Sequence, residues 1–366
     1  MVSERAAFER ALAEAARGRG EVEPNPCVGA ALARGDQIVG VGFHAAYGEA
    51  HAEAALLDAA GSLKGCVLYV TLEPCSHHGK TPPCADAVIA ARPDRVVVLN
   101  EDPNPKVAGR GLARLREAGL ETSLSTDEEL RQRERDLNRR YHAHRARERA
   151  WVVAKWAMTL DGKIASRGGD SKWISSKASR QEVHRLRAHV DAVLIGAGTA
   201  LQDDPRLTPR DVPIVRSPTR VVLDSHGRLP ESAKLLQDIE RFPLRIFTTE
   251  RSCEDWRKRL EARGALLTVQ PGVDRVDLEA VLVELRNQKL ERVLLEGGSE
   301  LLGSAFDAQL IDMVDAYVCP RLLGGQDAKT PWPGQGRETM AEALTLDDAQ
   351  WRSFESDQRL RGFVKY

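Results

Sequence analysis

One imidazole, two thiols and a carboxylate stand at spacings that suit a metal ion which activates water. His51 and Glu53 are separated by one alanine, Cys75 follows a proline, and Cys84 follows two prolines. Three protein ligands leave the fourth position of a tetrahedral zinc ion open, as in catalytic rather than structural sites. Glu53 would stay off the metal, take a proton from the activated water and pass it to the substrate. The sequence therefore predicts a catalytic zinc centre with His51, Cys75 and Cys84 as ligands.

The interval between the two cysteines departs from the spacing of nucleobase deaminases. Those enzymes carry H-x-E followed by P-C-x-x-C, whereas eight residues separate Cys75 from Cys84 here. A structural zinc site that also uses His77 or His78 as a fourth ligand is the alternative. We favour a catalytic site, because a structural one has no need of the carboxylate of Glu53.

The composition is that of an ordinary globular chain with enough apolar material for two cores. The chain has 366 residues, of which 42% are hydrophobic and 29% charged, and its formal net charge is −1. At about 150 residues per domain, this length predicts two domains. The balanced charge gives no electrostatic reason to expect a nucleic-acid or membrane partner, and no apolar run approaches the roughly 20 residues of a membrane span. The start of the chain lacks an apolar signal segment, and the scattered cysteines form no disulfide framework, so we expect a cytoplasmic protein.

Strands and helices are expected to alternate in the first half of the chain. Helices are expected at residues 3–17, 52–60, 84–91 and 109–118, and strands at 28–33, 37–42, 66–71, 95–99 and near Leu120. This alternation predicts a sheet flanked by helices. Cys75 would follow a strand while His51 and Cys84 open helices, so the three ligands can converge at one end of the sheet. A helix N-terminus also stabilises a thiolate.

Residues 127–149 are rich in charges of both signs and poor in large apolar side chains. Mixed charge of this kind predicts a solvated helix, which we interpret as a linker between two domains. An arm that binds nucleic acid is the alternative, but Glu128, Glu129, Glu134 and Glu148 dilute the basic charge.

A second alternation begins at Trp151. Strands are expected at residues 151–157, 191–195, 220–224, 244–248, 265–269, 292–296 and 312–318, and helices at 177–189, 254–263, 278–287 and 300–306. Two turns containing Gly196-Ala197-Gly198 and Gly297-Gly298 follow strands, where backbone amides can approach a phosphate. Each turn taken alone is better explained as a tight turn. Neither fits G-x-G-x-x-G, so a standard dinucleotide fold is not indicated.

The motifs of the first half resemble those of the bifunctional riboflavin-biosynthesis deaminase–reductase family. The matching segments are P-N-P-C-V-G at 24–29, H-A-E at 51–53, T-L-E-P-C-S-H-H-G-K-T-P-P-C at 71–84, D-P-N-P at 102–105 and G-R-G at 109–111. In that family the long interval between the cysteines is normal. The resemblance implies an α/β protein in which residues 1–147 form a cytidine-deaminase-like zinc domain and residues 148–366 a dihydrofolate-reductase-like domain that uses NADPH. Each domain would have a central sheet flanked by helices.

The resemblance also implies two successive reactions. Zinc-dependent hydrolysis would deaminate 2,5-diamino-6-(5-phosphoribosylamino)pyrimidin-4(3H)-one, with Glu53 as the catalytic residue. NADPH would then reduce the ribosyl group of 5-amino-6-(5-phosphoribosylamino)uracil to ribityl. The polar residues 76–81, which lie between the cysteines, are suited to a ribose phosphate. Asn25 can bind a pyrimidine edge through its amide, although a turn residue between prolines explains it equally well.

In the second domain the resemblance implies a cofactor site beside a substrate site. The implied cofactor-binding residues are Ala157, Trp173, Thr199, Asp203, Ser225, Gly298, Ser299, Glu300, Leu301, Leu302, Gly303 and Ser304. The implied substrate-binding residues are Lys155, Ser171, Arg187, Leu207, Arg210 and Glu296. Arg187 and Arg210 suit phosphate because guanidinium pairs with it bidentately, and surface ion pairs are the alternative. Lys155 would anchor the substrate ring, and Asp203 would assist proton transfer.

One residue conflicts with NADPH as the cofactor. Asp224 ends an expected strand, and in a dinucleotide-binding fold an acid there favours NAD over NADP. The expected fold is a different one, so NADPH is retained.

The two-step enzyme would act on small-molecule substrates, and we expect it to form a homo-oligomer. Two other classes of function are the alternatives. A nucleic-acid base deaminase with an accessory binding domain conflicts with the near-zero net charge. An inactive zinc scaffold conflicts with the complete set of His51, Glu53, Cys75 and Cys84.

Overall fold

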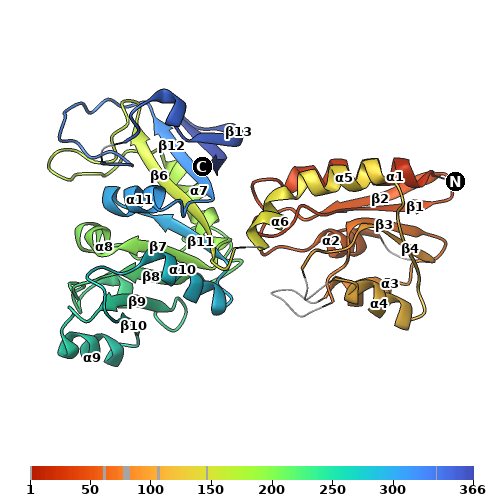
Figure 1. Cartoon of the computed structure of the whole chain (residues 1–366), viewed down its shortest axis with the longest axis horizontal. Coiled ribbons are helices and arrows are strands. Elements are labelled where there is room, and N and C mark those ends of the chain that lie inside the picture. Colours follow the sequence, from red (N-terminus) through yellow and green to blue (C-terminus); the bar gives the residue numbers. More distant parts are fainter. Residues whose placement is uncertain (1, 61–62, 77–82, 105–107, 146, 335) are drawn as a thin grey trace. The chain divides into compact units, whose positions relative to one another are not determined.

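The computed structural model describes residues 2–60, 63–76, 83–104, 108–145, 147–334 and 336–366. The chain divides into two compact units, Met1–Arg147 and Glu148–Tyr366, each built around its own sheet (Figure 1). Within the described ranges, no helix is both long and apolar enough to cross a membrane.

A five-stranded sheet in the order β2-β1-β3-β4-β5 forms the centre of the first unit. β1 pairs antiparallel with β2 and β3, whereas β3, β4 and β5 are parallel. The strands are β1 (Gly29–Arg34), β2 (Gln37–Phe43), β3 (Val67–Leu72), β4 (Arg95–Asn100) and β5 (Glu121–Leu124). The α-helices are α1 (Glu4–Ala15), α2 (Ala52–Ala60), α3 (Cys84–Ala91), α4 (Arg110–Glu117), α5 (Glu128–Leu137) and α6 (Arg139–Arg145). A sheet flanked by helices is therefore confirmed here.

The central strands β1, β3 and β4 are mostly apolar on both faces, and helices cover both faces of the sheet. One face packs Leu32, Val70 and Val98 against α2, α3 and α4. The opposite face packs Tyr69 and Leu99 against α1 and α5. Figure 1 shows α1 and α5 on one side of the sheet and α2, α3 and α4 on the other. Because successive strand residues point to opposite faces, a nearly continuous apolar run is what a two-sided core requires.

The segment over residues 127–149 is helical as expected, but its interpretation as a solvated linker is wrong. It contains α5 and α6, which belong to the first unit. Leu130, Glu134 and Tyr141 are buried, and α5 packs against α1 and β4. Charged residues dominate this segment, but its few apolar and polar inward positions recur at helical spacing, and that spacing lets the segment cover the sheet.

A nine-stranded sheet in the order β10-β9-β8-β7-β11-β6-β12-β14-β13 forms the second unit. It is parallel from β10 to β12 and antiparallel at β14 and β13. The strands are β6 (Trp151–Thr159), β7 (Ala192–Gly196), β8 (Thr219–Leu223), β9 (Leu244–Thr249), β10 (Leu266–Gln270), β11 (Arg292–Glu296), β12 (Met313–Cys319), β13 (Thr345–Phe354) and β14 (Asp357–Lys365). The α-helices are α7 (Lys177–Ala188), α8 (Ala197–Asp203), α9 (Glu254–Ala262), α10 (Leu278–Asn287) and α11 (Ser299–Asp307).

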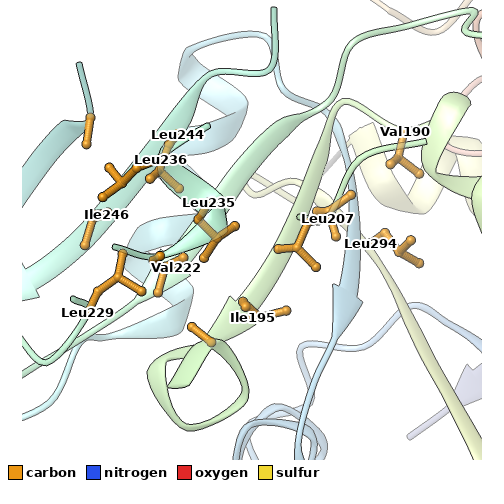
Figure 2. Packing of buried hydrophobic residues seen from close by; sticks show 14 of the residues in the cluster. Val190, Ile195, Leu207, Val222, Leu229, Leu235, Leu236, Leu244, Ile246 and Leu294 are labelled. Carbon is orange, nitrogen blue, oxygen red and sulfur yellow. The ribbon is translucent and has the colours of Figure 1, made fainter. Parts of the chain in front are cut away.

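Two cores sandwich the parallel part of this sheet. On one face, Ile195, Val222 and Leu294 pack with Leu235 and neighbouring apolar residues (Figure 2). Residues of α7 and α9 cover this core. On the other face, side chains that alternate with these pack under α10 and α11. Because helices cover both faces of this mostly parallel sheet, ligands are expected to bind at the carboxyl ends of its strands.

Two parts of the second unit lie outside the sequence-based expectations. The short helix α8 directly follows β7, where only a glycine turn was expected. The hairpin of β13 and β14 closes one edge of the sheet. β13 is mostly exposed, so it lacks the apolar alternation that identifies a strand, and its position depends on pairing with β14.

Candidate active sites

The three expected metal ligands converge on one point in the first unit. His51 directly precedes α2, Cys75 lies in the loop after β3, and Cys84 is the first residue of α3. Nδ1 of His51 lies 3.2 Å from Sγ of Cys84 and 3.7 Å from Sγ of Cys75. The ligand atoms of all three residues lie within 4.8 Å of one another.

This donor set fits zinc. Bonds of about 2.0 to 2.3 Å to a tetrahedral ion separate its ligand atoms by about 3.5 Å. A hydrogen bond from the Cys84 thiol lowers the pKa of Cys75 against the effect of burial, and a second hydrogen bond from His51 lowers it further, which favours the thiolate that a zinc ion binds. The backbone amide of Cys84 also donates to Sγ of Cys75 at 3.2 Å. His77 and His78, the alternative fourth ligands, lie outside the described residues.

Glu53 lies in the first turn of α2, beside the three ligand atoms. Its side chain is only 3% exposed. Burial raises the pKa of Glu53 to about 7, although the nearby His51 opposes this. A carboxyl group whose pKa is near neutrality can both accept and return a proton, which is the property that an acid–base catalyst needs.

Asn25 is brought to the same site through His44. Nδ2 of Asn25 lies 3.2 Å from Nε2 of His44, and Nδ1 of His44 lies 2.9 Å from the carbonyl oxygen of Ala50. The ring of His44 packs edge-on against that of His51 at 5.0 Å between centroids. If the amide of Asn25 donates to Nε2, then Nδ1 carries the proton of His44. The side chain of Asn25 thus contacts a histidine that packs against the expected metal ligand His51.

Glu73 lies two residues before Cys75 and helps to position the loop that carries this ligand. It belongs to the motif at residues 71–84, but the sequence alone did not indicate this role. Its buried carboxylate accepts hydrogen bonds from the amides of Gly109 (2.9 Å) and Leu112 (3.0 Å) at the start of α4. Gly111 lies so close that a Cβ there would stand 2.0 Å from the carbonyl oxygen of Pro74. The loop that carries Cys75 is therefore packed tightly against α4.

The second unit contains a cavity of about 1400 Å³ at the carboxyl ends of β6, β7, β8 and β11. Most of the residues implied for the cofactor and the substrate line it: Lys155, Ala157, Ser171, Trp173, Arg187, Thr199, Asp203, Leu207, Arg210, Ser225, Glu296, Gly298, Ser299, Glu300, Leu301 and Ser304. Two do not. Leu302 is fully buried in the core beneath the sheet, and a Cβ on Gly303 would meet Pro333. Helical spacing turns these two residues of α11 away from the cavity.

A largely buried ion pair lies in this cavity. Arg187 donates to both carboxylate oxygens of Glu296, at 2.5 and 2.8 Å. Burial alone would raise the pKa of Glu296, but Arg187 and then Lys155 lower it to about 2. Burial lowers the pKa of Lys155, against the charge of Glu296. The guanidinium of Arg187 is thus already engaged, and Arg210 is the better placed of the two arginines for a substrate phosphate.

The conflict over Asp224 is resolved by its burial. The residue is fully buried, and its Oδ2 accepts hydrogen bonds from the amides of Arg228 (2.6 Å) and Leu229 (2.8 Å). A carboxylate that recognises the ribose hydroxyls of NAD must face the cofactor. Asp224 instead closes the turn after β8, so it provides no argument for NAD.

Two family models match the chain. The model described as the cytidine and deoxycytidylate deaminase zinc-binding region matches residues 1–100. The model described as the RibD C-terminal domain matches residues 150–360.

Curated relatives and solved structures cover almost the whole chain. A riboflavin biosynthesis protein RibD of Bacillus amyloliquefaciens is 40% identical over 97% of this chain and 95% of its own length. That of Aquifex aeolicus is 37% identical over 96% and 92%. A crystal form of Acinetobacter baumannii RibD matches with a TM-score of 0.74 and 34% identity over 99% of both chains. A diaminohydroxyphosphoribosylaminopyrimidine deaminase/5-amino-6-(5-phosphoribosylamino)uracil reductase of Thermotoga maritima matches with a TM-score of 0.67 and 31% identity over 99% of both.

Proposed function

The chain belongs to the RibD family of riboflavin biosynthesis proteins, and on this premise we propose how its residues divide the family's two reactions. The protein is a deaminase and a reductase, with zinc and NADPH as cofactors. We assign the deamination to residues 1–147 and the reduction to residues 148–366. The two compact units and the two separate family matches support this division.

The substrates proposed are those named for the relative from Thermotoga maritima. The first unit would deaminate a diamino-hydroxy-phosphoribosylaminopyrimidine, and the second would reduce the resulting phosphoribosylamino-uracil. Both are small phosphorylated molecules. The cationic side chains of Arg210 and Lys155 in the cavity of the second unit support a phosphorylated substrate.

In the first unit, His51, Cys75 and Cys84 would hold zinc, which supplies Lewis-acid activation of water. Glu53 would take one proton from the attacking water and pass it to the ring nitrogen, and it would then take the proton of the newly added hydroxyl group and pass it to the departing ammonia. Its burial and its raised pKa suit both transfers. Asn25 would orient the pyrimidine from the position that His44 gives it. The convergence of the three ligands beside a buried glutamate is the observation that supports this assignment most strongly.

In the second unit, NADPH would supply a hydride to the ribosyl carbon. The residues of the chain would bind and orient the substrate around it. Arg210 would contact the substrate phosphate, while Arg187 would hold Glu296 ionised and fixed in the cavity. Lys155 would face the substrate ring from β6, and Asp203 would assist proton transfer from the end of α8.

A paired assay tests the division of labour. The purified chain should contain about one zinc ion and, given the pyrimidine substrate and NADPH, should release ammonia before it oxidises NADPH. After removal of zinc by a chelator, ammonia release should stop, while NADPH oxidation on the deaminated substrate continues. Loss of both activities, or of neither, would contradict the assignment of the reactions to separate units.

We also propose a homo-oligomer that is cytoplasmic and binds no nucleic acid. The near-zero net charge supports the last point. Light scattering at several protein concentrations measures the oligomeric state, and cell fractionation measures the location. A protein that stays a monomer at high concentration would contradict the first proposal.

A further inference from the structure

The cavity wall formed by residues 223–276 is positively charged. It includes His226, Arg228, Lys234 and Arg275, and no carboxylate from this stretch lines the cavity. Lys234 is paired with Asp204 at 3.1 Å. The fixed charges that remain for a ligand are therefore those of Arg228 and Arg275.

Arg228 and Arg275 come from different segments that meet at the end of β8. Asp224 fixes the turn that presents Arg228 by accepting the amide of that residue. Ser225 Oγ accepts a hydrogen bond from the amide of Val276 at 3.0 Å, which ties the segment carrying Arg275 to the same turn. Two separate anchors thus bring the two arginines to one corner of the cavity.

Neither arginine donates a side-chain hydrogen bond to a carboxylate. Arg228 forms only a long ion pair, in which its Nε lies 3.9 Å from Oδ1 of Asp224, beyond hydrogen-bonding distance. Among the described residues, none forms an ion pair with Arg275, and its neighbour Asp274 is paired with Arg251. This corner therefore offers two guanidinium groups to an anion.

The order of the strands places this corner at the far end of the cavity from the reacting groups. In the sequence β8-β7-β11-β6, β11 carries Glu296 and β6 carries Lys155. With neighbouring strands about 4.8 Å apart, the end of β8 lies roughly 10 Å from that of β11 and roughly 14 Å from that of β6. The turn after β11 opens α11, whose N-terminal amides suit a pyrophosphate.

A dinucleotide that transfers hydride must place its nicotinamide near the substrate groups on β6 and β11. Its pyrophosphate then lies near Gly298 and Ser299, and its adenosine extends towards β8. We propose that Arg228 and Arg275 bind the 2′-phosphate of NADPH and so select NADPH over NADH. This inference rests on the proposed reductase function and names the residues that set its cofactor specificity.

The experiment measures binding rather than turnover. Dissociation constants for NADP⁺, NAD⁺ and 2′,5′-ADP are determined by calorimetry for the full-length protein, the variant Arg228→Ala/Arg275→Ala, and the control Arg259→Ala. Arg259 is half-exposed and pairs with Glu231 outside the cavity wall. The double variant should bind NADP⁺ and 2′,5′-ADP at least tenfold more weakly, because each arginine forms charge-assisted hydrogen bonds. Its affinity for NAD⁺ should be unchanged, which also shows that the variant is folded.

The same measurements distinguish failure of the proposed 2′-phosphate site from failure of the proposed reductase function. An unchanged ratio of NADP⁺ to NAD⁺ affinity in the double variant would overturn the inference, and so would an equal loss of both ligands. Raising the salt concentration should weaken the binding of NADP⁺ to the wild-type protein more than that of NAD⁺. Failure of the wild-type protein to bind either nucleotide would contradict the reductase function itself.

Discussion

The side chain of Asn138 holds the backbone of Cys27 through two hydrogen bonds. Its Oδ1 accepts from the amide of Cys27 at 2.7 Å, and its Nδ2 donates to the carbonyl oxygen at 3.0 Å. Nδ2 also donates to the buried carboxylate of Glu134 at 2.6 Å. Because Cys27 lies two residues after Asn25, the end of α5 fixes the segment from which Asn25 reaches the metal site.

Asn138→Ala should therefore weaken substrate binding as well as stability. We expect the KM for deamination to rise, and the free energy of unfolding of the first unit to fall by about 2 kcal/mol, because two buried backbone groups lose their partners. Zinc content should stay the same. The control is Arg133→Ala, an exposed position on α5. A loss of stability without any change in KM would mean that Asn138 serves only the fold.

Glu53→Gln should separate metal binding from catalysis. The amide keeps the size of the side chain but cannot accept and return the proton, so ammonia release should fall by about 10²-fold to 10⁴-fold. Zinc content should be unchanged, since Glu53 is not proposed as a ligand. Reduction of the deaminated substrate by the same preparation is the internal control. Loss of zinc in this variant, or retained deamination, would remove Glu53 from its proposed role.

Gly111→Ala should weaken zinc binding from a distance. The added Cβ would stand 2.0 Å from the carbonyl oxygen of Pro74, so the loop carrying Cys75 must shift. We expect a lower zinc content after dialysis and slower deamination. Gly168→Ala is the matched control, because the nearest atom to its Cβ is 3.8 Å away. Full zinc content in Gly111→Ala would show that the loop can adapt.

Arg210→Ala should raise the KM of the reductase by about tenfold and leave kcat nearly unchanged, as expected when a residue binds the ground state and the transition state equally. Arg210 is the better candidate for the substrate phosphate, because the guanidinium of Arg187 already donates two hydrogen bonds to Glu296. Arg185→Ala, an exposed residue on α7 that pairs with Glu182, is the control. A fall in kcat at constant KM would instead place Arg210 among groups that act only in the transition state.

Glu296→Gln should make the second unit less stable in a way that depends on pH. The pKa of Glu296 is lowered to about 2 on folding, so its ionised form stabilises the fold above about pH 4.5, and this contribution is lost as the pH falls towards 2. The difference in unfolding free energy between wild type and variant should be about 1 kcal/mol smaller at pH 3.5 than at pH 7. Urea titrations at both pH values measure it. A difference that does not change with pH would contradict the ion pair with Arg187.

The sequence alone determined the chemistry of the first site and most of the elements around it. His51, Glu53, Cys75 and Cys84 belong to motifs whose spacing sets which residues open helices or follow strands, and this is local information. Apolar runs likewise marked the parallel strands, because strands buried on both faces are apolar at nearly every position.

Only the tertiary structure decided which side chains face the sites. It packed α5, from the charged segment over residues 127–149, against the first sheet, where Asn138 holds the backbone of Cys27. It buried Asp224 against its own turn and pointed Leu302 into the core. It also paired β13 with β14, although β13 is mostly exposed. Burial and pairing depend on partners far away in the sequence, so a local pattern of charge or hydrophobicity does not determine them.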